Sequence, residues 1–138
     1  MHRYRQFDHT ADLGVEAYGK TPGELFANAA FAVFDILTDL KHVNPSVEKK
    51  VVVAGDGWED LLVNYLREVL YLYNGQGLLL KEFLIDHIES RHLEGRVSGE
   101  PLDTAKHRIN TEIKAVTYHQ AAVKEDHGMW QGRVIFDV

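Results

Sequence analysis

The residues with the clearest chemical potential lie near the start of the chain, in the segment Asp8-His9-Thr10-Ala11-Asp12. Two carboxylates, a hydroxyl and an imidazole occur there, between two segments that we expect to be strands. Short oxygen-bearing side chains in a connecting loop suit a hard cation, which binds several oxygens at once. The same residue types also favour a plain turn, because Asp and Thr side chains accept hydrogen bonds from backbone N–H groups there. Spacing alone leaves both interpretations open.

The end of the chain is a second candidate for chemistry. We interpret Arg133–Val138 as a strand that places hydrophobic residues on one face and Ile135 and Asp137 on the other. Such a strand would fix the terminal carboxylate of Val138 close to the Asp137 side chain. That carboxylate offers oxygens that an internal residue lacks, although a well-ordered terminal strand is also an ordinary structural feature.

The remaining reactive residue types assemble no recognisable catalytic centre. The eight histidines include no H-x-x-x-H or H-x-H pair, which leaves a helix-borne zinc site unsupported. His119 ends a predicted strand, where it is either a pocket residue able to titrate or an ordinary surface histidine. The chain has no cysteine, and it contains no nucleophile elbow, phosphate-binding glycine loop or dinucleotide fingerprint. We therefore assign no catalytic residue and expect that the protein is not an enzyme.

Two helices are expected to support these segments. The first spans residues 22–40, with Thr21 as its N-cap, Pro22 at its first position and Glu24 completing a capping box. The second spans residues 57–75. Its apolar positions recur at helical spacing, Asp56 resembles a capped start, and Asn74-Gly75 predicts a left-handed stop. Helix-on-sheet core packing explains its stripe better than a cofactor-binding face.

The other segments have the composition and alternation of strands. We expect strands at Tyr4–Phe7, Leu13–Tyr18, Val47–Ala54, Leu79–Glu89, Leu93–Ser98, Thr111–Tyr118, Ala122–Glu125 and Arg133–Val138. Within the sixth of these, Ile113, Ala115 and Thr117 are expected to share one face. Because most strands follow the helices, the pattern predicts an α+β fold. We expect a single compact domain over residues 1–138, with two long helices packed on a mostly antiparallel β-sheet.

Charge and composition restrict the partners. The 138 residues carry a formal charge of −6, and the fifteen Lys and Arg residues are scattered. A protein that grips nucleic acid alone usually carries a basic stripe, so we expect no strong direct nucleic-acid binding. No apolar run is long enough to span a membrane, and no secretory signal begins the chain, so we expect no membrane partner. The absence of cysteine is compatible with a cytoplasmic location, which we also expect.

Several of these segments together resemble the archease family. The resemblance rests on Phe7-Asp-His-Thr-Ala-Asp-Leu-Gly14, Ala17-Tyr-Gly19, the helix start Thr21-Pro-Gly-Glu-Leu-Phe26, the strand Ile113-Lys-Ala-Val-Thr-Tyr-His119 and the ending Val134-Ile-Phe-Asp-Val138. These motifs span the whole chain in order. The family fold is a compact α+β domain, in agreement with the fold expected from the residues.

The resemblance implies a function that composition does not. Archeases are accessory proteins of the RNA ligase that seals tRNA halves in tRNA splicing and also repairs RNA. They promote guanylylation of the ligase histidine by GTP and its multiple turnover, without catalysing ligation. Two alternatives stay open: a chaperone-like module for RNA-modifying enzymes such as tRNA methyltransferases, and a small metal-dependent hydrolase. The hydrolase would need a general base that the sequence does not offer.

The resemblance also implies a cofactor, a divalent metal ion that is most often calcium. Carried across by motif, its ligands are Asp12, Asp137 and Val138, the last through its backbone or carboxylate. Asp8 and His9 match the motif without being assigned as ligands. The resemblance thus requires that two aspartates from opposite ends of the chain meet at one ion.

Overall fold

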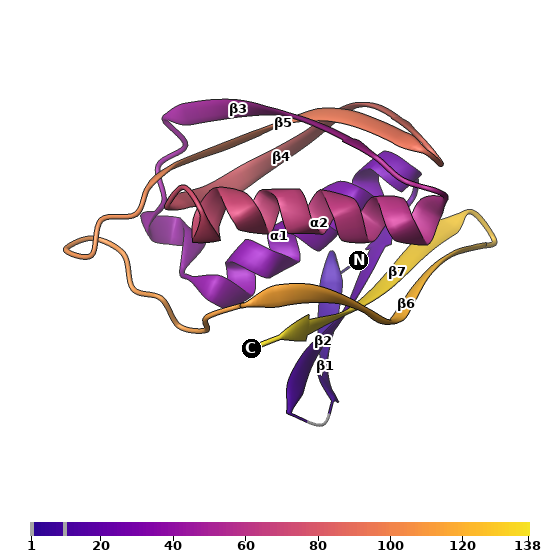
Figure 1. Ribbon diagram of the computed structural model, residues 1–138, viewed down its shortest axis with the longest axis horizontal. Helices are drawn as coiled ribbons and strands as arrows, with labels where there is room; N and C mark the ends of the chain where they lie inside the picture. Colours follow the sequence, from indigo (N-terminus) through magenta and orange to yellow (C-terminus); the bar gives the residue numbers. More distant parts are fainter. Residues whose placement is uncertain (1, 10) are drawn as a thin grey trace.

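The strands form two separate sheets with both long helices between them, as Figure 1 shows. The computed structural model describes residues 2–9 and 11–138. One sheet has four strands in the order β1-β2-β7-β6, and the other has three in the order β3-β5-β4. Every neighbouring pair of these strands is antiparallel. The predicted α+β class is confirmed, with the strands divided between two sheets instead of forming one.

The order of elements along the chain matches the expected order. The elements are β1 (Tyr4–His9), β2 (Asp12–Gly19), α1 (Pro22–Leu37), the 3-10 turn η1 (Leu40–His42), β3 (Val47–Ala54), α2 (Trp58–Asn74), β4 (Leu78–Glu89), β5 (His92–Pro101), β6 (Ala115–Asp126) and β7 (Met129–Asp137). Helix α1 ends three residues before the expected position 40. At Thr38 the backbone becomes extended, and its hydroxyl donates to the Arg108 carbonyl at 2.7 Å.

Helix α2 begins and ends by other means than the sequence predicts. Its N-cap is Gly57, with φ 139° and no side-chain cap, while the Asp60 carboxylate accepts from the Asp56 N–H at 2.8 Å. The expected cap by Asp56 is therefore wrong, because the carboxylate of the first turn reaches back instead. At the other end Gly75 remains right-handed, and the left-handed residue is Gly77, with φ 70°.

The start of α1 confirms the predicted N-cap and supplies a stability test. Thr21 Oγ1 accepts a hydrogen bond from the Glu24 N–H at 3.1 Å. We expect Thr21→Ala to lower the free energy of unfolding by about 1 kcal/mol, because that N–H loses its partner. Urea denaturation measures the change. Thr21→Ser keeps the hydroxyl and serves as the control; an equal loss in both variants would contradict the capping role.

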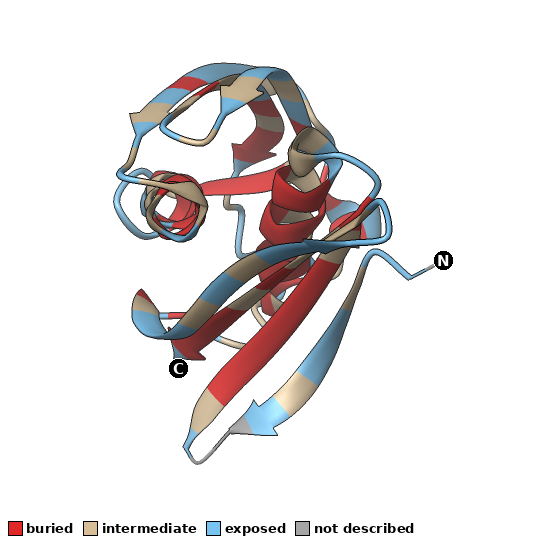
Figure 2. Cartoon of the chain, turned by 90° about the vertical axis from the view of Figure 1, so that its right-hand side faces the viewer, coloured by how far each residue is buried: buried red, intermediate tan, exposed pale blue. Residues whose placement is uncertain are grey.

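The core lies where both helices face the two sheets, and Figure 2 shows these inner surfaces as buried. The predicted apolar stripe of α2 is buried, apart from Trp58, which is partly exposed. The Phe26 ring of α1 packs against Trp58 and Tyr65, with 6.0 Å between ring centroids in both cases. Within the described part of the chain, the fully buried Tyr65 hydroxyl has no hydrogen-bond partner. Burial raises the pKa of this hydroxyl.

Strand β6 replaces two expected strands. Residues 115–118 and 122–125 belong to one irregular strand whose pairing with β7 shifts between Thr117 and Ala122, and residues 111–114 precede this strand. Gln120 lies in this interval with φ 56°, a left-handed backbone conformation. His119 lies there too, within the strand and exposed, and not at a strand end. The local irregularity interrupts the alternation, which explains why the sequence pattern suggests two strands.

The face expected for the start of this strand is also wrong. Ile113 is buried, but it precedes β6, which begins at Ala115. The next buried residue is Val116, whereas Ala115 is exposed. A loop residue in the core three positions before Val116 does not follow the period of two that a strand requires.

Side chains of α2 cover the outer edge of β6. Arg67 donates to the Val116 carbonyl through Nε and Nη2, at 3.2 and 3.1 Å. Farther along the strand, the Val123 N–H donates to Glu59 Oε2 at 3.1 Å. Unpaired edge groups can pair with another chain, so these contacts protect the edge.

No helix in the described residues is long and apolar enough to cross a membrane.

Candidate metal site

The two predicted aspartate ligands lie at neighbouring strand ends. In the antiparallel pairing of β2 with β7, Leu13 is opposite Phe136. One further step along each strand places Asp12, the first residue of β2, opposite Asp137, the last residue of β7. Residues opposite each other in such a pair have Cα atoms about 4.5–5.5 Å apart. The register therefore brings together two residues from opposite ends of the chain.

Alternation also places both aspartates on one face of the sheet. Leu13 and Phe136 are buried in the core between the sheets. Because successive strand residues point to opposite faces, Asp12 and Asp137 belong to the outer face of the four-stranded sheet. Asp8 pairs with Leu13 across the β1–β2 hairpin and so takes the inner face. This placement separates Asp8 from the two aspartates that the family resemblance selects.

The backbone around Val138 is held by β6. The Lys114 N–H donates to the Asp137 carbonyl at 2.8 Å, and Ala115 pairs with Asp137. Val138 follows directly and is 38% exposed. Val138 itself lies outside β7, which ends at Asp137. The predicted strand to Val138 is therefore one residue too long at its end, and a role of Val138 as a ligand stays a prediction.

The segment between Asp8 and Asp12 forms the connection of a hairpin. Asp8 pairs with Leu13 and His9 with Asp12, so Ala11 belongs to the connection between the two strands. Ala11 has φ 60°, in the left-handed region that tight hairpin connections use. The turn interpretation is correct for the backbone. The described part of the chain does not include Thr10 or the side chain of His9.

The donor set suits a hard divalent cation. No group of three or more His, Cys, Asp or Glu side chains among the described residues is arranged to hold a metal. The predicted site contains only two such side chains, Asp12 and Asp137, so its further oxygens have to come from the main chain of Val138. Carboxylate and main-chain oxygens together are the ligands that calcium prefers. The residues present therefore fit this ion in chemical type.

An aromatic contact that the sequence analysis missed holds the hairpin beside these aspartates. Phe7 of β1 is opposite Gly14 of β2, and its ring occupies the space that a Cβ atom at Gly14 would need. The guanidinium carbon of Arg133 lies 4.1 Å from the centroid of this ring. Glycine opposite an aromatic residue in a short hairpin is the signal that could have revealed the contact. It ties β1 to β2 and β7 on the outer face.

A nearly buried carboxylate reinforces the same face. Glu16 Oε1 accepts hydrogen bonds from the Tyr18 hydroxyl at 2.8 Å and from Arg5 Nε at 3.2 Å. Burial opposes its ionisation, but hydrogen bonds from Tyr18, Gln131 and Arg5 outweigh burial and lower the pKa of Glu16. Glu16 therefore stays charged and cross-links β1 and β2, two residues inward from Gly14.

Comparison with known proteins places this arrangement in a family. The chain, an α+β protein with two helices between two antiparallel sheets, matches the model of the Archease protein family over residues 4–138. The chain is 35% identical to Protein archease of Methanosarcina barkeri over 140 aligned positions, covering 99% of the chain and 96% of the relative. It is 34% identical to Protein archease of Pyrococcus furiosus, with complete coverage of both.

Solved structures agree with these sequence matches. The solution structure of Protein 1598 of Methanobacterium thermoautotrophicum superimposes with a TM-score of 0.84 at 34% identity, covering 99% of both chains. An archease crystal structure from Thermotoga maritima matches with a TM-score of 0.63 at 24% identity, which shows the fold alone. The chain belongs to the archease family. The family resemblance drawn from the sequence is thereby confirmed.

Proposed function

We propose that this protein is an accessory activator of the tRNA-splicing and RNA-repair ligase, and that it promotes guanylylation and multiple turnover of that enzyme. Membership of the archease family supports this function. The observation that supports it is the register of β2 and β7, which pairs Leu13 with Phe136, the neighbours of Asp12 and Asp137. Two carboxylates at an exposed sheet end contribute nothing to the packing of the hydrophobic core. They are suited instead to take part in phosphate chemistry on a partner.

The activator would use a divalent metal, most simply calcium, held by Asp12, Asp137 and Val138. Calcium accepts oxygen ligands at about 2.3–2.6 Å in flexible geometry, which two strand ends and a main-chain group can supply. When bound, such an ion would stabilise charge that develops on phosphate oxygens during nucleotidyl transfer. The two aspartates hold and orient the site at the exposed sheet end, where a partner can reach it.

A ligation assay tests the proposed activation. We expect the cognate ligase, supplied with GTP and excess RNA ends, to complete many more rounds of sealing when this chain is present. Ligase that is already guanylylated should complete one round equally well without it, because the activator acts before sealing. An unchanged turnover number with the chain added would contradict the proposal, as would acceleration of the single pre-guanylylated round alone.

Direct binding to the ligase separates this function from the chaperone-like alternative. The ligase, and not a tRNA methyltransferase, should be recovered from a cell extract with the tagged chain. A cytoplasmic location, in the same compartment as such a ligase, stays a prediction.

A further inference from the structure

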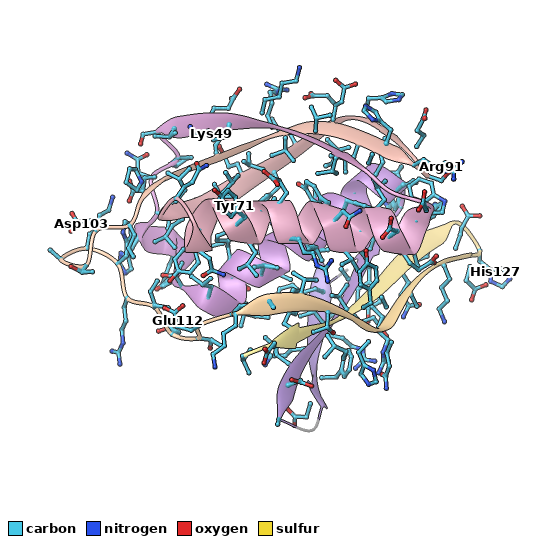
Figure 3. All side chains as sticks on the ribbon, viewed as in Figure 1. Lys49, Tyr71, Arg91, Asp103, Glu112 and His127 are labelled. Carbon is cyan, nitrogen blue, oxygen red and sulfur yellow. The ribbon has the colours of Figure 1, made fainter. Side chains whose placement is uncertain are left out.

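A hollow lined by lysines lies at the end of the molecule from which the loop with Asp103 projects (Figure 3). Its volume is about 350 Å³. The residues that line it come from three separate parts of the chain: the segment 41–45 after α1, Lys81 in β4 and Lys106 in the loop after β5. Together they contribute Lys41, Lys81, Lys106 and His42 to one surface. We call this surface the lysine hollow.

Two of its lysines are held in place by polar contacts. Lys81 Nζ donates to the Val43 carbonyl at 3.1 Å, which fixes the ammonium group against the loop after α1. Lys106 Nζ donates to Glu100 Oε1 at 2.6 Å. An ammonium group has three N–H donors, so each of these lysines keeps donors for a further partner. The hollow is therefore lined by cations that are already positioned.

A buried network beneath the hollow fixes Glu100. The Nε2 atom of His107, whose side chain is fully buried, lies 2.5 Å from Glu100 Oε1. His107 Nδ1 accepts a hydrogen bond from the Asp103 N–H at 3.0 Å, so the proton of a neutral ring is on Nε2, facing the carboxylate. Hydrogen bonds from Lys106, Asn44 and His107 lower the pKa of Glu100 against the effect of burial. This charged anchor holds the Lys106 loop.

The local charge contrasts with the charge of the whole protein. The chain has 21 acidic and 15 basic residues, yet three of those basic residues line this single hollow. The carboxylate of Asp39 lies 3.7 Å from Lys41 Nζ, in an exposed pair of the kind that water screens strongly. Among the described residues, no carboxylate forms an ion pair with Lys81. The three lysines of the hollow therefore face two carboxylates, those of Asp39 and Glu100, and Lys81 is the lysine whose charge has no carboxylate partner among the described residues.

We propose that the lysine hollow binds a diphosphate group, supplied either as inorganic pyrophosphate or as the phosphate tail of a nucleotide. Several ammonium groups around a small volume call for several negative charges close together, and lysine recognises phosphate as a point charge. The volume is that of a small-molecule site. Among the described residues that line the hollow there is no Phe, Tyr or Trp, so the imidazole of His42 is the single ring on which a base could stack. Recognition therefore falls on the phosphates.

Titration with sodium pyrophosphate tests this site directly. Binding is measured by calorimetry in a metal-free buffer of low ionic strength, because salt screens exposed charges. We expect Lys81→Gln and Lys41→Gln each to raise the Kd for pyrophosphate at least about tenfold. Lys124→Gln removes the same charge from β6 and should leave the Kd unchanged, as should Asp12→Ala. The last variant separates this proposal from the proposed ligase activation, which depends on Asp12.

Two further ligands decide which chemistry is recognised. ADP should bind with the same dependence on Lys81 as pyrophosphate, while adenosine should not bind. Sodium sulfate at equal ionic strength should compete only weakly, because it carries a single anionic centre. An equal loss of affinity for pyrophosphate in Lys81→Gln and Lys124→Gln would overturn the proposal, because it would show that binding reflects general charge attraction. The proposal would also be overturned if pyrophosphate did not bind and an RNA oligonucleotide bound in a way that depends on Lys81. Circular dichroism checks that each variant is folded.

Discussion

Asp12→Ala and Asp137→Ala are each expected to abolish the stimulation of multiple-turnover ligation while leaving the chain folded. The two residues lie at the ends of β2 and β7, each next to a member of the Leu13–Phe136 pair, and alternation places them on the outer face of the sheet. Their removal takes away charge and oxygen ligands without opening a cavity in the core, so circular dichroism should be unchanged. The rate of ligation under multiple turnover should fall to that of the ligase alone.

Asp126→Ala is the matched control for these variants. Asp126 lies at the opposite end of the same sheet, next to His127, which Figure 3 labels at the β6–β7 turn. This control should stimulate the ligase as the parent does. If a folded Asp12→Ala variant stimulates ligation as well as the parent does, the sheet end with Asp12 takes no part in activation. Residues added after Val138 test its main-chain oxygens in the same assay, and should also reduce stimulation.

The response to calcium distinguishes a metal site from a purely structural role. A ligand that binds only the folded state stabilises it by an amount that grows with its concentration. Calcium should therefore raise the Tm of the parent and of Asp126→Ala, and leave the Tm of Asp12→Ala unchanged. A calcium-induced rise of equal size in Asp12→Ala would show that the ion binds elsewhere.

Phe26→Ala is expected to have the largest effect on stability. The Phe26 ring is fully buried and touches both Trp58 and Tyr65, so it joins α1 to α2 between the two sheets. Its truncation removes apolar contacts and leaves a cavity, at a cost of about 3–5 kcal/mol in the free energy of unfolding. Urea denaturation measures the loss. Phe26→Leu should lower the free energy of unfolding clearly less, because the leucine side chain fills most of the space that the phenylalanine ring occupied.

Tyr65→Phe provides the opposite case in the same cluster. The Tyr65 hydroxyl is buried without a partner among the described residues, whereas its ring packs against Phe26. Removal of an unsatisfied buried hydroxyl keeps the packing and relieves a desolvation cost. The free energy of unfolding should stay equal or rise. A loss above about 1 kcal/mol in this variant would mean that the hydroxyl has a stabilising partner, such as a buried water.

The elements themselves could be predicted because their signals are local. The Thr21 cap and the stripe of α2 are properties of neighbouring residues, and both are confirmed. The separation into two sheets could not be predicted, because periodicity does not say which strands pair. The start of β6 shows a further limit: Ile113 enters the core from a loop, where no strand period applies.

The candidate site divides in the same way. The sequence predicts one strand that begins directly after Asp12 and another that contains Asp137, but only the family resemblance selects these two residues as partners. The pairing of β2 with β7 brings their neighbours Leu13 and Phe136 opposite each other. The Phe7 contact with Gly14 and the bonds around Glu16 depend on side chains meeting across strands, for which a single sequence gives no register. The lysine hollow likewise gathers residues from three distant segments.

The pairing of the second strand with the last strand has a consequence in time. Asp12 leaves the ribosome 125 residues ahead of Asp137, and β2 has only β1 beside it until β7 is made. At synthesis rates of about 5–20 residues per second, this interval lasts roughly 6–25 s. The two aspartates can therefore meet only after β7 has been synthesised. Incomplete chains that stop before β7 would lack the paired aspartates, so nascent and prematurely terminated products could not compete with the mature protein for its partner.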